Sequence, residues 1–452
     1  MSRPSTLDLL QRYESRNVTF VEADRSWPMV WERAKGVHVW DDTGKRYLDL
    51  TAAFGVAAAG HSNPRVVAAG RRQMGRLLHA MGDVHPHRLK GELARVLSQR
   101  TFEHWTKAPH PERTRTTHGK TIFCSSGFEA VEAALKTALL ATGKAGVIAF
   151  EKAYHGVGYG ALNATHRAHF RSPFLAQLRQ FGTFLPFPAI PPADPARGRR
   201  HGDTLDSLEA GLRAHLRKKT IGAILAEPIQ VRGGINIPPP GFLPLLRSLC
   251  DEHGAVLILD EIYTGFGRTG KWFACEHAGV VPDLVCLGKA LTGGFPLSAC
   301  VGRAELMDAA WPRSTGEAIH TSTFLGHPVG CAMALANLAE IQRRHLVECS
   351  AESGRFLLER LASIRGRLST APRFQVQARG LGLLAGLELL RPSGEAATDQ
   401  VLALIKSLLH EGFIFLPEGE HANVVGFTPP LTISAKQLEL AVSALARKLA
   451  QA

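Results

Sequence analysis

The sequence predicts an α/β protein, in which a three-layer, mainly parallel sheet forms a large domain beside a smaller α+β domain. Between about residues 75 and 330, short apolar runs alternate with helical periodicities, as expected when helices cover both faces of parallel strands. The chain has 452 residues, of which 45% are hydrophobic. This is enough apolar material for two domains, each with a core of its own.

The first 75 residues are expected to form an arm and a hairpin that complete the smaller domain. Residues 1 to about 25 interleave apolar and polar side chains, as in an arm that packs on a partner subunit. Residues 37–50 alternate around Asp-x-x-Gly, which indicates a β-hairpin. Helical periodicity resumes near Val66.

Residues 76–335 are expected to form the large domain. Its predicted strands are 121–124, 146–150, 221–226, 256–259, 284–287 and 297–301. Two segments rich in Pro, Arg and His, 104–120 and 186–204, are predicted to be loop insertions whose role the sequence does not explain. Residues 336–452 contain a long helical pattern, a strand-like segment at 413–416, a Pro-Pro segment at 429–430 and a helix from Ala435, and are predicted to form the smaller domain.

Composition argues against several classes of protein. The net charge of +13 comes without a nucleic-acid motif or interleaved aromatic residues, so we expect a solvated basic surface and no nucleic-acid partner. No apolar run is long enough to span a membrane and the N-terminus lacks a signal core, so the expected location is the cytoplasm. Seven widely spaced cysteines predict buried thiols, and no metal site is expected.

The first candidate catalytic residue is Lys289, which follows an apolar run and precedes the glycine-rich turn Gly293-Gly294. An amine on a tight, desolvated turn loses part of its preference for the charged form, so it can attack an aldehyde and form a Schiff base. On its own, a lysine before such a turn is more often a surface residue. Residues upstream of Lys289 favour the catalytic interpretation.

Asp260 ends the apolar run 255–259, which reads as a parallel strand buried on both faces. Ligands of open α/β sheets bind at the carboxyl ends of the strands, where Asp260 lies. A lysine for an aldehyde and an aspartate for a protonated ring nitrogen together suit pyridoxal phosphate, whose chemistry needs a charged pyridinium.

Other strand ends carry candidate binding groups. Ser126 and Gly127 lie where a strand passes into a helix, and the free N–H groups there could bind phosphate, although such a turn is more often only an N-cap. Tyr154 could stack on a flat heterocycle or simply pack in a loop. Glu227 adds a polar group at a third strand end. Because these strand ends lie along one edge of the predicted sheet, we expect a binding crevice there.

Six motifs occur together in the order and approximate spacing of class III, or ω, aminotransferases, which the chain resembles from about residue 28 to its C-terminus. The motifs are Ser126-Gly127-Phe128-Glu129-Ala130, Tyr154-His155-Gly156, Glu227-Pro228-Ile229-Gln230, the run Asp260 to Gly270, Gly288-Lys289-Ala290-Leu291 and Thr323-Phe324-Leu325-Gly326-His327-Pro328. The resemblance implies the fold type I architecture of pyridoxal-phosphate enzymes and a homodimer with active sites at the subunit interface.

The resemblance also implies roles for the catalytic residues. Lys289 would hold the cofactor and then, as general base and acid, move a proton between the substrate and the cofactor. Asp260 would pair with the pyridine nitrogen, and Ile262 and Tyr154 would sandwich the ring. Tyr263 stands where the family usually has a glutamine, and its hydroxyl could take over the place near the phenolic oxygen.

The phosphate would be held by two sets of groups. Gly127 and Phe128 would bind it through backbone N–H groups, and Thr323 would add its hydroxyl from the neighbouring subunit. Phe128 replaces the usual small or hydroxylated residue, so one side-chain contact to phosphate is expected to be missing.

Departures from the family pattern bear on the substrate. Gly426 stands where many relatives have an arginine that grips the substrate carboxylate, and Val157 replaces another arginine after His-Gly. Arg232, where relatives often have a glutamate, could receive the carboxylate of an oxo-acid or could be a loop residue facing solvent. Phe54, in place of a polar tyrosine, indicates a less polar pocket for the donor.

The predicted function is a transaminase that moves an amino group from an ω-amino acid or primary amine to a 2-oxo acid, pyruvate or 2-oxoglutarate, by a ping-pong mechanism. The alternative enzyme is a racemase or aminomutase on the same scaffold, which needs no second substrate. A catalytically silent scaffold protein is a third reading, and the retention of Lys289, Asp260 and Glu227 argues against it. The sequence does not identify the donor, the stereochemical preference, or whether dimers pair into tetramers.

Overall fold

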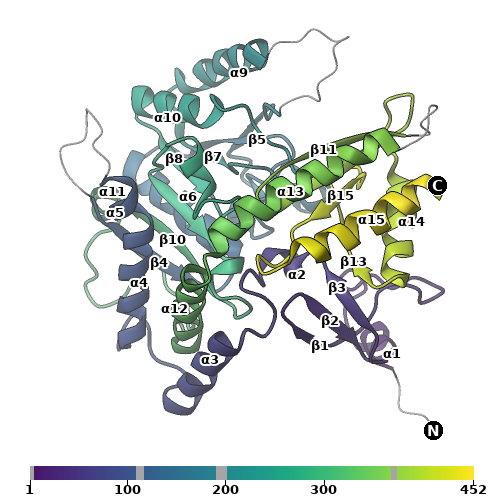
Figure 1. Ribbon diagram of the computed structural model, residues 1–452. Coiled ribbons are helices and arrows are strands. Elements are labelled where there is room, and N and C mark those ends of the chain that lie inside the picture. The colour runs from purple at the N-terminus through teal and green to yellow at the C-terminus, as the bar shows by residue number, and fades with distance from the viewer. Residues whose placement is uncertain (1–4, 108–116, 190–200, 368–373, 452) are drawn as a thin grey trace.

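A central seven-stranded sheet organises the protein in a computed structural model, which describes residues 5–107, 117–189, 201–367 and 374–451 (Figure 1). The strands lie in the order β4-β10-β9-β8-β7-β5-β6, and β10 alone runs antiparallel to its neighbours. Their bounds are β4 (Gly119–Cys124), β5 (Gly146–Phe150), β6 (Gly182–Leu185), β7 (Ile221–Ala226), β8 (Val256–Asp260), β9 (Leu284–Leu287) and β10 (Ser298–Arg303). The predicted mainly parallel sheet is confirmed.

Helices cover both faces of this sheet because its side chains alternate between two apolar clusters. In β8, Val256 and Ile258 join the cluster that includes α6 (Gly127–Thr142), whereas Leu257 and Leu259 join the main core on the opposite face. All four are buried. The remaining helices of this half are α4 (Arg88–Arg100), α5 (Phe102–Trp105), α7 (Tyr159–Leu162), α8 (Ala168–Arg171), α9 (His201–Leu216), α10 (Phe242–His253), α11 (Ala304–Ala310) and α12 (Pro328–Arg343), with short 3-10 turns η1 (Ser172–Gln177), η2 (Ala274–His277) and η3 (Lys289–Leu291).

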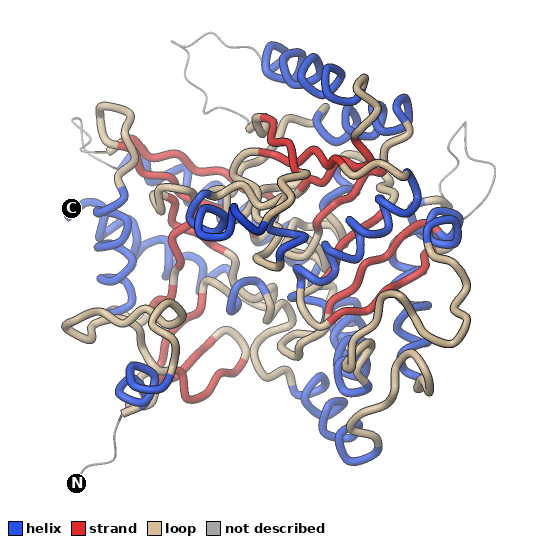
Figure 2. The backbone as a smooth tube through the Cα atoms, turned by 180° about the vertical axis from the view of Figure 1, so that it is seen from behind, coloured by secondary structure: helices blue, strands red, loops and turns tan. Residues whose placement is uncertain are grey.

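Two smaller four-stranded sheets lie on the side of the molecule that carries the C-terminus (Figures 1 and 2). One is formed by β1 (Trp31–Lys35), β2 (His38–Asp41), β3 (Arg46–Asp49) and β13 (Phe413–Ile414). The other is formed by β11 (Gln375–Leu381), β12 (Leu384–Leu390), β15 (Val424–Phe427) and β14 (Leu416–Glu418). The helices α13 (Leu346–Arg367), α14 (Thr398–His410) and α15 (Ala435–Gln451) accompany them.

The N-terminal hairpin joins the C-terminal part of the chain through hydrogen bonds. β2 and β3 pair antiparallel, as the sequence predicts, and β13 adds parallel to β3 with Phe413 opposite Leu48. After the hairpin come the short turn α2 (Ala52–Gly55) and α3 (Pro64–Arg76), which packs against α12. The division of the chain at residues 75 and 335 stays a prediction.

Several elements differ from the sequence-based expectation. β6 was not predicted, because this edge strand is only half-buried and has one glycine and one threonine among four residues. The helix expected after about residue 335 begins at Pro328, with proline at its first turn. Much of both predicted insertions, residues 108–116 and 190–200, lies outside the described part of the chain.

The N-terminal arm contains α1 (Thr6–Tyr13), which starts with a capping box between Ser5 and Asp8. None of its residues is buried, and Leu9 and Tyr13 are exposed. An amphipathic helix with an exposed apolar side is compatible with the expected packing on a partner subunit, which stays a prediction.

Candidate active site

A cavity of about 250 Å³ opens at the carboxyl edge of the central sheet. It is lined by Gly127, Phe128, Tyr154, His155, Gly156, Val157, Glu227, Ile229, Arg232, Asp260, Ile262, Tyr263, Thr264 and Lys289. The loops that follow β4, β5, β7, β8 and β9 supply these residues, because parallel strands end on the same side of a sheet. The structure thus brings together nine of the residues selected from the sequence.

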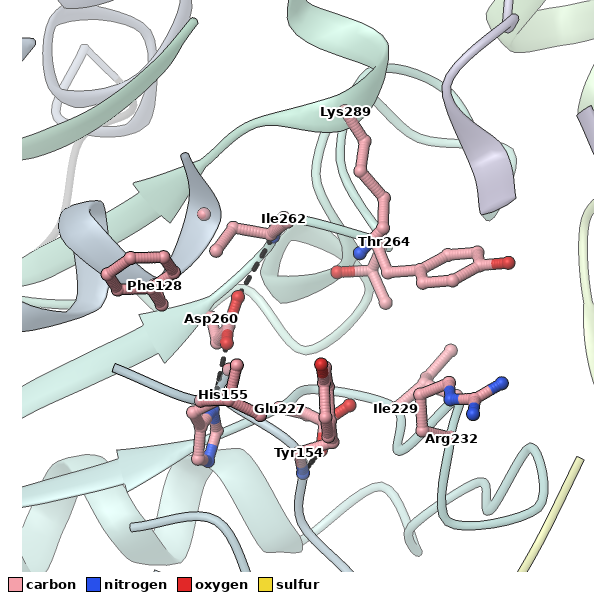
Figure 3. Close-up of a pocket in the computed structure, with 14 residues that line it drawn as sticks. Phe128, Tyr154, His155, Glu227, Ile229, Arg232, Asp260, Ile262, Thr264 and Lys289 are labelled. Atoms are coloured by element: carbon pink, nitrogen blue, oxygen red, sulfur yellow. Dashed lines mark hydrogen bonds and ion pairs between the residues drawn. The ribbon is translucent and has the colours of Figure 1, made fainter. Parts of the chain in front are cut away.

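Lys289 begins the short turn η3 after β9, and its side chain extends into the cavity (Figure 3). Its φ of 42° lies in the left-handed region, a strained conformation of the kind that functional sites hold. The amine lies 4.4 Å from the centre of the Tyr263 ring. Burial lowers the pKa of Lys289, although the carboxylates of Asp260 and Glu227 act in the opposite direction.

Asp260 is the last residue of β8 and is buried at the centre of the site. Its Oδ1 accepts the backbone N–H of Ile262 at 3.1 Å, and its Oδ2 lies 2.8 Å from Nδ1 of His155 (Figure 3). His155 is itself buried, so the imidazole and the main chain together fix the direction of the carboxylate. An anionic group is therefore held rigidly at this strand end.

Glu227 follows β7 and binds two backbone groups. Its Oε1 accepts the N–H of Tyr154 at 3.0 Å, and its Oε2 accepts that of Val231 at 3.4 Å. Burial raises the pKa of Glu227 to about 7, and the nearby Asp260 carboxylate adds to this effect. Glu227 thus connects the loop that carries Tyr154 to the loop that leads to Arg232.

The start of α6 offers polar groups for an anion. Ser126 is the N-cap residue, but its side chain makes no capping bond. Its buried Oγ has no hydrogen-bond partner among the described residues. Gly127 packs closely beside it: a Cβ there would lie 3.1 Å from Cδ1 of Ile262, so that side chain would have to shift. The first N–H groups of a helix lack partners within the helix and attract an anion such as phosphate.

Tyr263 forms a buried wall of the cavity. Its hydroxyl lies 3.3 Å from Oγ1 of Thr428, and burial raises the pKa of the phenol. A Cβ on Gly55 would lie only 2.8 Å from its ring, and the φ of Gly55 is +80°, so glycine is needed at that position. The ring is therefore fixed in place from the side of α2.

At the far end of the cavity, Arg232 is paired with an acid that the sequence did not single out. Its Nη1 lies 3.3 Å from Oε2 of Glu418, the last residue of β14. The Arg232 side chain is 28% exposed, whereas that of Glu418 is 3% exposed. Arg232 is thus a pocket residue with a buried counter-ion.

Four predicted substrate or cofactor residues do not line the cavity in the single chain. One of them, Ser126, is the N-cap of α6 and directly precedes the lining residue Gly127. Thr323 is exposed, as a residue offered to a neighbouring subunit would be. Phe54 is 52% exposed and has a φ of 62°. Gly426 is buried in β15, where a Cβ would lie 3.0 Å from Cγ of Glu418.

Sequence reasoning missed the roles of His155 and Glu418. The position of His155 inside the Tyr-His-Gly motif was a signal, but its contact with Asp260 joins the loop after β5 to the end of β8, 105 residues away. Glu418 gave no local signal, since it lies in a short strand and meets Arg232 across 186 residues.

A lysine that reaches into the cavity and a buried, oriented aspartate, at the ends of the neighbouring strands β9 and β8, are the arrangement of a pyridoxal-phosphate enzyme of fold type I. The comparisons with known proteins identify the family: residues 20–449 match the model of class-III aminotransferases, and the chain belongs to this family. It is a pyridoxal-phosphate-dependent aminotransferase.

Relatives and solved structures agree with this assignment. The chain is 36% identical over 421 residues to the 5-aminovalerate aminotransferase of Pseudomonas aeruginosa, covering 93% of each protein. It is 36% identical over 414 residues to the putrescine aminotransferase of Pectobacterium atrosepticum, covering 90% of this chain and 79% of the relative. A thermostable ω-transaminase mutant from Pseudomonas jessenii superposes with a TM-score of 0.86 at 27% identity, covering 99% and 98%. These relatives are transaminases, and none favours the racemase alternative.

The residues present suit the cofactor of this family. The orphaned Ser126 hydroxyl and the uncapped start of α6 provide for a phosphate, and Asp260 provides a fixed negative charge for a ring nitrogen. Among the described residues, no cluster of His, Cys, Asp or Glu could hold a metal ion. In that same part of the chain, no helix combines the length and apolar character needed to cross a membrane.

Proposed function

We propose that this aminotransferase moves an amino group from a terminal primary amine or an ω-amino acid to a 2-oxo acid such as pyruvate or 2-oxoglutarate. The observation that carries the proposal is the lysine amine of Lys289 in a cavity whose far end holds Arg232. The donor and the acceptor use the same cavity in turn, which is the ping-pong order expected for one site with one reactive lysine.

We assign the cofactor contacts to the residues selected from the sequence. Asp260 would hold the ring nitrogen, while Ile262 and Tyr154 would contact the two ring faces. Ser126 and the N–H groups of Gly127 and Phe128 would hold the phosphate. When bound, pyridoxal phosphate supplies an aldehyde and a ring that withdraws electrons from the substrate carbon.

Lys289 both binds and moves protons in this proposal. Because burial lowers its pKa, a larger share of the amine is neutral near physiological pH than for a lysine in water. A neutral Nζ can act as nucleophile, and once released it can take a proton from the substrate carbon and return it elsewhere. Tyr263, whose ring lies beneath this amine, limits where Nζ can go.

Arg232 is assigned to the carboxylate of the oxo-acid. The Gly426 position offers no cation, so Arg232 supplies one from the loop after β7. Its guanidinium can form a two-point contact with a carboxylate once it leaves Glu418. If Arg232→Ala leaves the KM values for pyruvate and 2-oxoglutarate unchanged, this assignment is wrong.

We further propose a homodimer in which Thr323 reaches the neighbouring active site. Exposed apolar side chains gather near it: segments 77–84 and 319–324 touch each other through His79 and Phe324, whose rings are 5.3 Å apart. Leu78, Ile319 and Phe324 are all more than half exposed. Apolar patches of this kind mark subunit interfaces. Sedimentation should give a dimer, and Phe324→Asp should shift it toward monomer. A cytoplasmic location stays a prediction of the sequence.

The experiment that tests the reaction is a coupled assay with a panel of terminal amines and ω-amino acids, with and without an oxo-acid. Transfer requires both substrates and gives an amino acid product from the oxo-acid. A racemase or aminomutase would consume the donor alone. Turnover that does not depend on the oxo-acid would overturn the proposal.

A further inference from the structure

Behind Arg232, which lines the far end of the cavity, lies the buried carboxylate of Glu418, which can accept further hydrogen bonds. Glu418 is 3% exposed and accepts one hydrogen bond, from Arg232 at 3.3 Å, among the described residues. A carboxylate can accept about four hydrogen bonds, so the single long bond to Arg232 leaves room for a further donor. A buried charge with so little compensation is costly unless a ligand completes it.

Gly426 makes the room that Glu418 fills. β14 and β15 pair so that Leu416 lies opposite Gly426 and Glu418 opposite Val424. A Cβ on residue 426 would lie 3.0 Å from Cγ of Glu418 and 3.3 Å from the carbonyl oxygen of Leu416. The stem of Glu418 therefore passes over the bare α-carbon of Gly426. Gly426, which stands where many relatives have an arginine, thus leaves space for the side chain of Glu418.

The charges around Glu418 leave it able to accept a cation near neutral pH. Burial raises its pKa to about 7, while Arg232, Lys289 and Arg167 oppose that shift. The charge of Glu418 also helps to raise the pKa of the buried Tyr263 phenol. Arg232 is partly exposed and can turn toward solvent, so a ligand cation can take its place beside the carboxylate.

We propose that Glu418 binds the distal ammonium of a diamine donor, so that the enzyme prefers a terminal diamine to a monoamine of the same length. The inference rests on the proposed function, because the near amine must react with the cofactor that Lys289 would hold. Arg232 and Glu418 then serve opposite charges at one end of the cavity: Arg232 binds the carboxylate of the acceptor, and Glu418 binds the second ammonium of the donor.

The first test compares putrescine with butylamine, which has the same carbon chain and lacks the second charge. In the wild-type holoenzyme, kcat/KM for putrescine should exceed that for butylamine by at least about tenfold, the size of one charge-assisted hydrogen bond. Glu418→Gln should remove most of this ratio. Gly426→Ala should lower it as well, because the added Cβ displaces the Glu418 stem. The control Glu420→Gln alters an exposed acid two residues away and should keep the ratio.

The second test measures binding without turnover. N,N,N′,N′-Tetramethylputrescine and N,N-dimethylbutylamine are tertiary amines that cannot form a Schiff base with the cofactor, and they differ in the distal ammonium. Titration calorimetry on the holoenzyme should give at least about tenfold tighter binding of the first in the wild type and similar binding of both in Glu418→Gln. Equal binding of both by the wild type, or the same ratio in Glu418→Gln, overturns the inference.

These two readouts separate the failure of this inference from failure of the proposed function. If no donor reacts at all, the proposed function fails, while calorimetry still decides whether Glu418 binds a cation. If butylamine and putrescine react equally well, the function stands and the role of Glu418 is refuted. A uniform loss with both donors in Glu418→Gln, with their ratio unchanged, shows a merely structural role and also refutes it.

Discussion

Replacing His155 by phenylalanine should slow the donor half-reaction by about 10- to 150-fold. In the structure, Asp260 has two fixed contacts, the 2.8 Å contact with the imidazole of His155 and the 3.1 Å bond from Ile262 N–H. The substitution would remove the first contact and leave a buried Oδ2 without its partner. A hydrogen bond to a charged group is worth about 1.5–3 kcal/mol, and each 1.4 kcal/mol corresponds to about tenfold in rate.

The assay is stopped-flow absorbance of the cofactor after mixing holoenzyme with a saturating donor in the absence of oxo-acid. Cofactor content must be measured for each variant, so that lost occupancy is not mistaken for slow chemistry. His155→Asn keeps an N–H donor near Asp260 and should recover part of the rate. A His155→Phe enzyme with full occupancy and a rate constant within about twofold of the wild type would show that Asp260 does not depend on His155.

Three further outcomes follow from the site and its surroundings. Lys289→Ala should lower the donor half-reaction by at least about 100-fold, the size of a general acid–base contribution, in the same stopped-flow assay. Gly156→Ala should lower the unfolding free energy measured in urea titrations by about 2–4 kcal/mol, because Gly156 has a φ of +106° and an added Cβ would lie 2.4 Å from the Cβ of Phe128. The control Gly143→Ala, at a φ of +66° with open space around the residue, should lower it by less. Burial raises the pKa of Glu418 from 4.5 to about 7, so the stability that this group contributes is present below about pH 4.5 and is lost as the pH rises through 7. The unfolding free energy of Glu418→Gln, relative to that of the wild type, should therefore rise by up to about 3 kcal/mol between pH 5 and pH 8. An equal difference between the two proteins at both pH values would contradict this.

The parts of the fold that the sequence predicted are those with strong local patterns. Among the predicted strands of the central sheet, β7, β8 and β9 are runs in which every residue is buried, because parallel strands with helices on both faces have no solvent-facing side. β6 escaped prediction because it lies at the sheet edge, where one partner strand and partial burial weaken the apolar signal. Local pattern therefore sufficed for the centre of the sheet and for the edge strand β4, which ends in the buried residues Phe123 and Cys124, and failed at the opposite edge, β6.

The candidate site divides in the same way. Lys289 and Asp260 were selectable because each follows its own apolar strand, and the sheet brings those strands side by side. The pair of Arg232 and Glu418 could not be selected from the sequence, because it forms only where the loop after β7 meets β14. The exclusion of a side chain at residue 426 likewise becomes visible only when β14 and β15 are paired.

The most direct test of the central claim is the absorption spectrum of the holoenzyme during titration with a terminal amine in the absence of any oxo-acid. The account predicts that the visible band of the lysine-bound cofactor disappears with the donor and returns when pyruvate or 2-oxoglutarate is added, and that Lys289→Ala lacks the band from the start. A wild-type band that no donor converts, or a Lys289→Ala protein with the same band, would contradict it.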